Sequence, residues 1–143
     1  MSVLATNELG EDLPPALSRD YSAVAASVQR ARGALVAMAR SAGAGAEQLE
    51  AVRLAVSEAL TNVVIHAYPD RAGRIHVLAS AARGEFMVEI ADDGLGFQTH
   101  TDTPGLGMGL GLISQVTDDF TIRQPQSGGT AVRMRFWFAP VGA

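Results

Sequence analysis

Glu58-Ala59-Leu60-Thr61-Asn62 decides the fold of this 143-residue sequence when it is taken together with two later stretches, Asp92-Asp93-Gly94-Leu95-Gly96 and Gly105-Leu106-Gly107-Met108-Gly109-Leu110-Gly111. The first stretch places an acid and an amide one helical turn apart. The second puts a carboxylate at the end of a strand, and the third is a glycine run that opens a helix. Each is a weak signal alone, but in this order they favour a nucleotide site, with ATP as the leading interpretation.

Composition limits the class of protein. A hydrophobic content of 48% with 18% charged residues is typical of one folded domain and argues against disorder. The net charge of −4, with scattered Lys and Arg, offers no patch for direct contact with nucleic acid. There is no cysteine for a disulfide or a thiolate metal site. No signal peptide and no apolar run of about 18 residues is evident, so we expect a cytoplasmic protein that does not contact the membrane.

Hydrophobic periodicity predicts alternating helices and strands. We expect residues 1–17 to be a lead-in with at most one short edge strand, and 18–143 to form a single domain. The pattern predicts helices from Ser18 or Asp20 to Arg40, from Ala46 to Ala67 and from Gly109 or Gly111 to about Asp118, and strands at 74–81, 85–91, 120–123 and beyond the turn at 126–129.

The last strand indicates how the layers are arranged. Val132, Met134, Phe136 and Phe138 alternate with Arg133, Arg135 and Trp137. Such alternation predicts a sheet with one face packed on helices. The expected fold class is therefore α/β (α+β), a two-layer sandwich with a mixed, mostly antiparallel sheet. The face that carries Arg133, Arg135 and Trp137 has no assigned role, and an outward Trp is compatible with a dimer or partner surface but is also ordinary on its own.

Angular positions on the helix 46–67 separate its polar and apolar residues. At about 100° per residue, with Glu58 at zero, Asn62 lies near 40° and His66 near 80°. The apolar stripe lies between about 120° and 200° on the same rule and consists of Leu49, Val52, Val56, Leu60, Val63 and Ala67. The polar trio therefore flanks the core, where it can reach a cleft between helix and sheet. An ordinary solvated helix face remains the alternative.

The other two stretches have both a binding and an ordinary interpretation. A carboxylate at Asp92 can accept a hydrogen bond from an exocyclic amine, which favours adenine over guanine, while Gly94 and Gly96 let the backbone approach a planar ligand; a plain Asp-Gly turn is the alternative. In the run 105–111, bare backbone amides can surround phosphate oxygens at the start of a helix; a flexible linker is the alternative. The interleaved apolar residues favour a loop attached to a core, and the Gly-Lys-Ser/Thr ending of a P-loop is missing.

These residues, with Gly129-Thr130, resemble the N, G1, G2 and G3 boxes of the GHKL ATPase superfamily, and the resemblance covers about residues 18–138. Within it, the segment 55–68 is similar to anti-sigma factor serine/threonine kinases of the RsbW and SpoIIAB type. The resemblance implies a Bergerat ATP-binding fold, although 1–17 shows no convincing first strand where the family usually has one.

The resemblance also implies roles for individual residues. Asn62 corresponds to the Mg²⁺ ligand, Glu58 to the general base and Asp92 to the adenine-binding carboxylate. Gly94 and Gly96 lie in the same adenine box, and Thr130 supports the adenine end. The implied phosphate loop consists of Gly105, Leu106, Gly107, Met108, Gly109, Leu110 and Gly111. His66 matches a position that is commonly His, and its chemistry leaves a structural and a binding role equally open.

The implied activity is transfer of the ATP γ-phosphoryl group to a Ser or Thr of an anti-anti-sigma (STAS-type) protein, which competes with a sigma factor for this chain; a homodimer is compatible with it. A short lid at 97–104 and the lack of a preceding helical hairpin with an acceptor His favour this over a sensor histidine kinase. Two alternatives stay open. One is a non-catalytic, nucleotide-gated binding module, and the other is a histidine-kinase catalytic module that acts on a separate chain.

Overall fold

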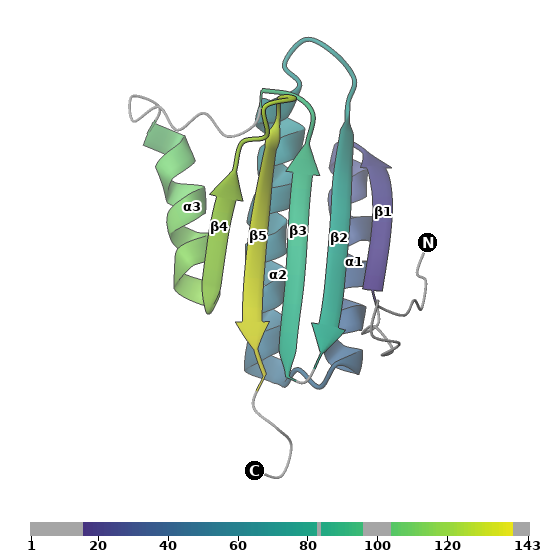
Figure 1. Ribbon diagram of the computed structural model, residues 1–143, viewed down its shortest axis with the longest axis vertical. Helices are drawn as coiled ribbons and strands as arrows, with labels where there is room; N and C mark the ends of the chain where they lie inside the picture. Colours follow the sequence, from purple (N-terminus) through teal and green to yellow (C-terminus); the bar gives the residue numbers. More distant parts are fainter. Residues whose placement is uncertain (1–15, 83, 96–103, 139–143) are drawn as a thin grey trace.

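The computed structural model describes residues 16–82, 84–95 and 104–138; for residues 104–109 it describes the backbone alone. In the described part of the chain, one face of a sheet is covered by helices (Figure 1). The elements are β1 (Ala16–Ser22), α1 (Ala25–Ser41), α2 (Ala46–Asn62), the π-helical turn η1 (Val63–Ala67), β2 (Arg74–Ala82), β3 (Glu85–Asp92), α3 (Pro104–Val116), β4 (Asp119–Arg123) and β5 (Thr130–Trp137). The predicted two-layer sandwich is confirmed.

The sheet has the strand order β1-β2-β3-β5-β4. All pairings between these described strands are antiparallel, which confirms the mostly antiparallel sheet that the sequence predicts; the parallel pair that a mixed sheet would contain is not found among them. The reason is that β5 lies between β3 and β4. Those two strands run in the same direction, but they are not neighbours, so they form no parallel pair.

Alternation along the strands sorts residues between the two faces, as predicted for the last strand. The face covered by helices carries Phe86, Val88 and Ile90 of β3 opposite Phe136, Met134 and Val132 of β5, all buried. Arg133, Arg135 and Trp137 lie on the helix-free face, where the Arg133 guanidinium contacts the Glu89 carboxylate at 3.0 Å.

Helix α2 is the central helix of its layer, since it contacts both α1 and α3. The predicted apolar stripe is confirmed: Val52, Val56, Leu60, Val63 and Ala67 are buried and Leu49 is half-buried. The helix begins where the Gln48 side chain accepts a hydrogen bond from the Gly45 N–H at 2.6 Å. Its last turn widens into η1, a π-helical conformation that the periodicity did not predict and that often accompanies functional sites.

The first helix was predicted to begin too early. Ser18–Ser22 belongs to β1 and the helix begins at Ala25. Pairing with β2 satisfies the backbone of this segment, and Leu17 and Tyr21 pack against the core. The family's first strand, which the sequence analysis did not find, is therefore present, and it crosses the expected boundary between residues 17 and 18.

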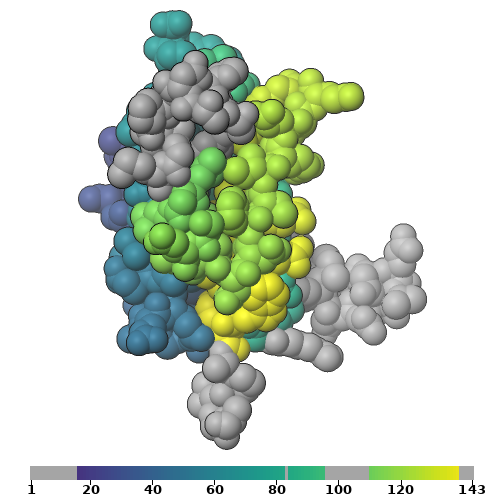
Figure 2. Space-filling view, turned by 90° about the vertical axis from the view of Figure 1, so that its left-hand side faces the viewer, coloured from purple at the N-terminus to yellow at the C-terminus, as the bar shows by residue number. Residues whose placement is uncertain are grey.

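The start of α3 also differs from the prediction. The helix was expected to begin at Gly109 or Gly111, after a glycine loop, but the backbone is helical from Pro104; the helix ends at Val116, close to the expected end near Asp118. Proline is favourable at the first helical position because the N–H it lacks would have no intrahelical partner there. Leu110 and Ile113, at helical spacing, hold the later turns against the core. Figure 2 shows the described side chains of α3 (green) between α2 (blue) and β4 (yellow-green).

Candidate functional site

The ends of β3, β5 and η1 meet at one end of the sheet and bring two of the predicted residues together. Asp92, the last residue of β3, is opposite Thr130, the first residue of β5. Both belong to the buried set of their strands, with exposed fractions of 5% for Asp92 and 1% for Thr130. The Asp92 carboxyl group and the Thr130 hydroxyl are thus buried at the edge of the helix–sheet interface. A carboxylate buried in such a place needs a polar partner to offset the loss of its hydration.

Two glycines make this junction possible. The Gly94 N–H donates to Asp92 Oδ1 at 2.9 Å, and the next N–H, of Leu95, donates to the carbonyl of Ala67 in η1 at 2.8 Å. A Cβ at Gly94 would lie 2.7 Å from the Ala67 carbonyl carbon and closer still to its oxygen. Gly129 has a φ of +82°, and a Cβ there would lie 2.8 Å from the Asp92 carbonyl carbon. Three backbone segments therefore approach one another more closely than side chains would allow.

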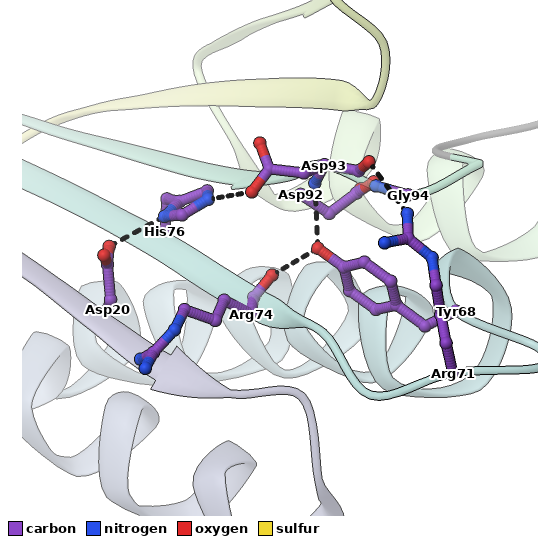
Figure 3. A network of polar contacts seen from close by, with 8 residues as sticks. All are labelled: Asp20, Tyr68, Arg71, Arg74, His76, Asp92, Asp93 and Gly94. Carbon is purple, nitrogen blue, oxygen red and sulfur yellow. Dashed lines mark hydrogen bonds and ion pairs between the residues drawn. The ribbon is translucent and has the colours of Figure 1, made fainter.

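A polar network on the other side of the turn holds the residue after Asp92 (Figure 3). The Tyr68 hydroxyl accepts a hydrogen bond from the Asp93 N–H at 2.8 Å and donates one to the Arg74 carbonyl at 2.7 Å. The Arg71 guanidinium lies 5.3 Å from the centre of the Tyr68 ring and reaches the Asp93 carbonyl at 3.4 Å. The turn is thereby tied to the segment between η1 and β2.

His76 ties the same turn to the edge of the sheet. Its Nδ1 lies 2.7 Å from the Asp20 carboxylate of β1, and its Nε2 lies 2.5 Å from the Asp93 carboxylate. The hydrogen bond with Asp20, followed by that with Asp93, raises the pKa of His76 above its usual value, and partial burial opposes this. The sequence analysis missed this network. His76 shares the polar alternation of β2, but only the strand register shows that it faces two carboxylates.

The predicted residues of α2 lie along its flank. Glu58 and Asn62 are half-buried one turn apart, and His66 is exposed on η1. The Asn62 Nδ2 atom is buried and has no hydrogen-bond partner among the described residues. Buried amides are nearly always paired, so this one suits a site that a ligand or water completes. Because amide O and N are assigned from their partners, either atom of Asn62 can face such a ligand.

The glycine-run residues are placed less completely. Leu110 and Gly111 are half-buried in α3, which packs on α2. For Gly105, Leu106, Gly107, Met108 and Gly109 the helical backbone alone is described, and Gly96 with most of the predicted lid lies outside the described residues. The first turn of a helix leaves N–H groups without intrahelical partners at the positive end of its dipole, so a helical glycine run retains amide donors for an anion.

Fold and site together define a histidine kinase-like ATPase domain: the family of that description matches residues 21–136, and the chain belongs to it. Its relatives include the anti-sigma F factor of Clostridium acetobutylicum, 30% identical over 104 residues that cover 65% of this chain and 73% of the relative. The anti-sigma F factor of Caldanaerobacter subterraneus is 30% identical over 115 residues, covering 73% of this chain and 80% of the relative. The resemblance stated from the sequence is confirmed.

A solved structure supports the fold. The crystal structure of the RsbU and RsbW domains of a Mycobacterium tuberculosis protein superposes with a TM-score of 0.69 at 24% identity. The match covers 88% of this chain and 33% of that longer one. Among the described residues, no helix combines the length and apolar character that crossing a membrane requires.

Proposed function

We propose that this chain binds ATP with Mg²⁺ at the junction of β3, β5 and η1 and acts as an anti-sigma regulatory factor. The observation that carries the proposal is the buried Asp92 carboxylate, held opposite Thr130 at the edge of the helix–sheet interface. A carboxylate there can accept a hydrogen bond from the adenine amine. Gly94 brings the backbone after Asp92 against Ala67 of η1, and membership of an ATPase family supports the same ligand.

We further propose that the chain is a protein serine/threonine kinase. Asn62 would hold Mg²⁺, which supplies charge neutralisation on the phosphates when bound. Glu58, one turn earlier on the same helix, takes the proton from the attacking Ser or Thr hydroxyl. The hydroxyl oxygen forms a bond to the γ-phosphorus, the bond to the ADP oxygen breaks, and ADP leaves. The amides in the first turn of the helical run 105–111, which have no intrahelical partners, would contact the phosphates, and His66, exposed on η1, would lie beside them.

The names of the relatives support the choice of partners. They are anti-sigma F factors, and we propose that this chain likewise sequesters a sigma factor in the cytoplasm. The phosphate acceptor is an anti-anti-sigma (STAS-type) protein, which binds in the dephosphorylated form. Phosphorylation adds charge at that interface and releases it.

The experiment combines binding and transfer. Calorimetry with ATP and Mg²⁺ should give a binding isotherm that is lost in Asp92→Asn and kept in Asp119→Asn, an exposed aspartate at the start of β4. Labelled ATP with a candidate acceptor should give an acid-stable phosphoprotein, lost in Glu58→Gln while nucleotide binding remains. An acid-labile product would instead support the histidine-kinase module. Binding without transfer to any acceptor would support the non-catalytic, nucleotide-gated module.

A further inference from the structure

Both ring nitrogens of one histidine face carboxylates that come from different parts of the chain. Asp20 lies on β1, at the edge of the sheet, while Asp93 directly follows the proposed adenine-binding Asp92 (Figure 3). A neutral imidazole carries one N–H and can therefore donate to one acceptor, whereas ionised carboxylates only accept. The imidazolium, with two N–H groups, is the form of His76 that satisfies both contacts.

Other groups around His76 do not replace this arrangement. The register places Ala91 of β3 opposite it, with Glu89 and Asp93 two residues to either side, and on β1 it places Ser18 and Ser22 beside Asp20. Glu89 is paired with Arg133. On its own strand, Arg74 and Leu78 flank His76 on the same face. Among the described residues, Asp20 and Asp93 are therefore the acidic groups that contact the ring.

The position of Asp93 connects this contact to the site. Its N–H and carbonyl are held by Tyr68 and Arg71, and its carboxylate is held by His76. The residue before it contributes the Asp92 carboxylate on the opposite face of the strand. Anchoring the Asp93 side chain therefore restricts the rotation of the β3 end that would turn Asp92 away from a bound base.

We propose that His76 is a positioning residue for the nucleotide: its imidazolium, held by Asp20, fixes Asp93 and thereby Asp92, so that nucleotide affinity falls when this proton is lost. The inference rests on the proposed nucleotide site. The raised pKa of His76 agrees with the geometry. By linkage, a nucleotide that favours the anchored turn also favours the protonated ring.

The test is calorimetric titration of the full chain with ADP and Mg²⁺ from about pH 6 to about pH 9, a range that spans the ordinary titration of His. As the pH rises through the titration of His76, we expect the wild-type dissociation constant, divided by that of His76→Gln at the same pH, to rise about fivefold. His76→Gln itself should bind ADP weakly at every pH and show no such transition. Referring the wild type to His76→Gln removes the contribution of ADP's own ionisation. Glu50→Gln, an exposed change on α2, should keep the wild-type profile.

Asp20→Asn supplies a second test that does not depend on removing the histidine. It should move the midpoint of the affinity change to lower pH, an effect that a merely structural role would not produce. NMR titration of the His76 ring, assigned by comparison with His76→Gln, should show a higher pKa with ADP bound than without. If the wild-type and His76→Gln profiles are parallel, or Asp20→Asn leaves the midpoint in place, the inference is overturned and the nucleotide site stands. If the wild-type chain binds no ADP at any pH, the site itself is refuted, and this inference with it.

Discussion

Gly128 and Gly129, in the turn directly before β5, offer a matched pair of substitutions. Both have positive φ, +107° and +82°, so alanine is strained at either position. A Cβ at Gly128 meets no heavy atom within 4 Å, whereas one at Gly129 would lie 2.8 Å from the Asp92 carbonyl carbon and 3.0 Å from the Asp93 Cα. Gly128→Ala therefore isolates the backbone strain, and Gly129→Ala adds a steric overlap with the site.

The magnitudes follow from these two terms. An unfavourable backbone conformation costs about 2 kcal/mol, and forcing an extra methyl group into a packed position adds about 2 kcal/mol. Gly128→Ala should thus lower the free energy of unfolding by about 2 kcal/mol and Gly129→Ala by about 4 kcal/mol, by the same two principles. At about 3 °C per kcal/mol for a domain of this size, the decreases in Tm are about 6 °C and about 12 °C.

Thermal unfolding followed by circular dichroism measures both values, and calorimetry with ADP and Mg²⁺ measures the effect on the site. Because the overlap pushes on the Asp92 backbone, Gly129→Ala should also weaken nucleotide binding in the fraction that remains folded, while Gly128→Ala should not. Equal destabilisation by the two substitutions, with equal nucleotide affinity, would refute the claim that Gly129 is required by close approach to Asp92.

Three further predictions concern the core and the turn. Leu60→Ala, at a fully buried position of α2 (0% exposed), should cost about 3 kcal/mol of unfolding free energy in urea denaturation, and Leu54→Ala, at 37% exposure, should cost much less; similar losses would contradict the assigned helix face. Tyr68→Phe removes one acceptor and one donor, so a loss of about 1 kcal/mol is expected in the same assay, and an unchanged urea midpoint would show that water replaces both bonds. Since the folded-state pKa of His76 is raised, its stabilising contribution is fully present below the unfolded-state pKa of about 6.5 and is lost as pH rises through the folded-state pKa. The difference in unfolding free energy between wild type and His76→Gln should therefore shrink from about pH 6 to about pH 9, and growth of that difference with pH would contradict the assignment.

What could be predicted from the sequence depends on local periodicity. The stripe from Val52 to Ala67 and the alternation along β5 are properties of neighbouring residues, so they identified the buried faces and hence the two layers. The Asp-Gly stretch was correctly placed at the end of a strand, and Asp92 is buried there as a binding carboxylate would be.

What could not be predicted depends on partners distant in sequence. β1 is a strand because β2 lies beside it, and residues 18–22 alone read as the start of a helix. The contacts of His76 require the registers of β1, β2 and β3 together. The glycine run is helical from Pro104 although glycine disfavours helices, because tertiary packing of the later turns outweighs local propensity.

The position of the single tryptophan provides an intrinsic spectroscopic reporter. Trp137 ends β5 at the opposite end from Thr130, is 51% exposed, and has its backbone N–H bonded to the Asp118 carboxylate at 2.7 Å. It also borders a groove between the start of α2 and the end of α3. Its emission and its quenching by iodide should therefore respond to a protein that covers this end and remain nearly constant on addition of nucleotide. One unlabelled sample can thus distinguish partner association from ligand occupancy.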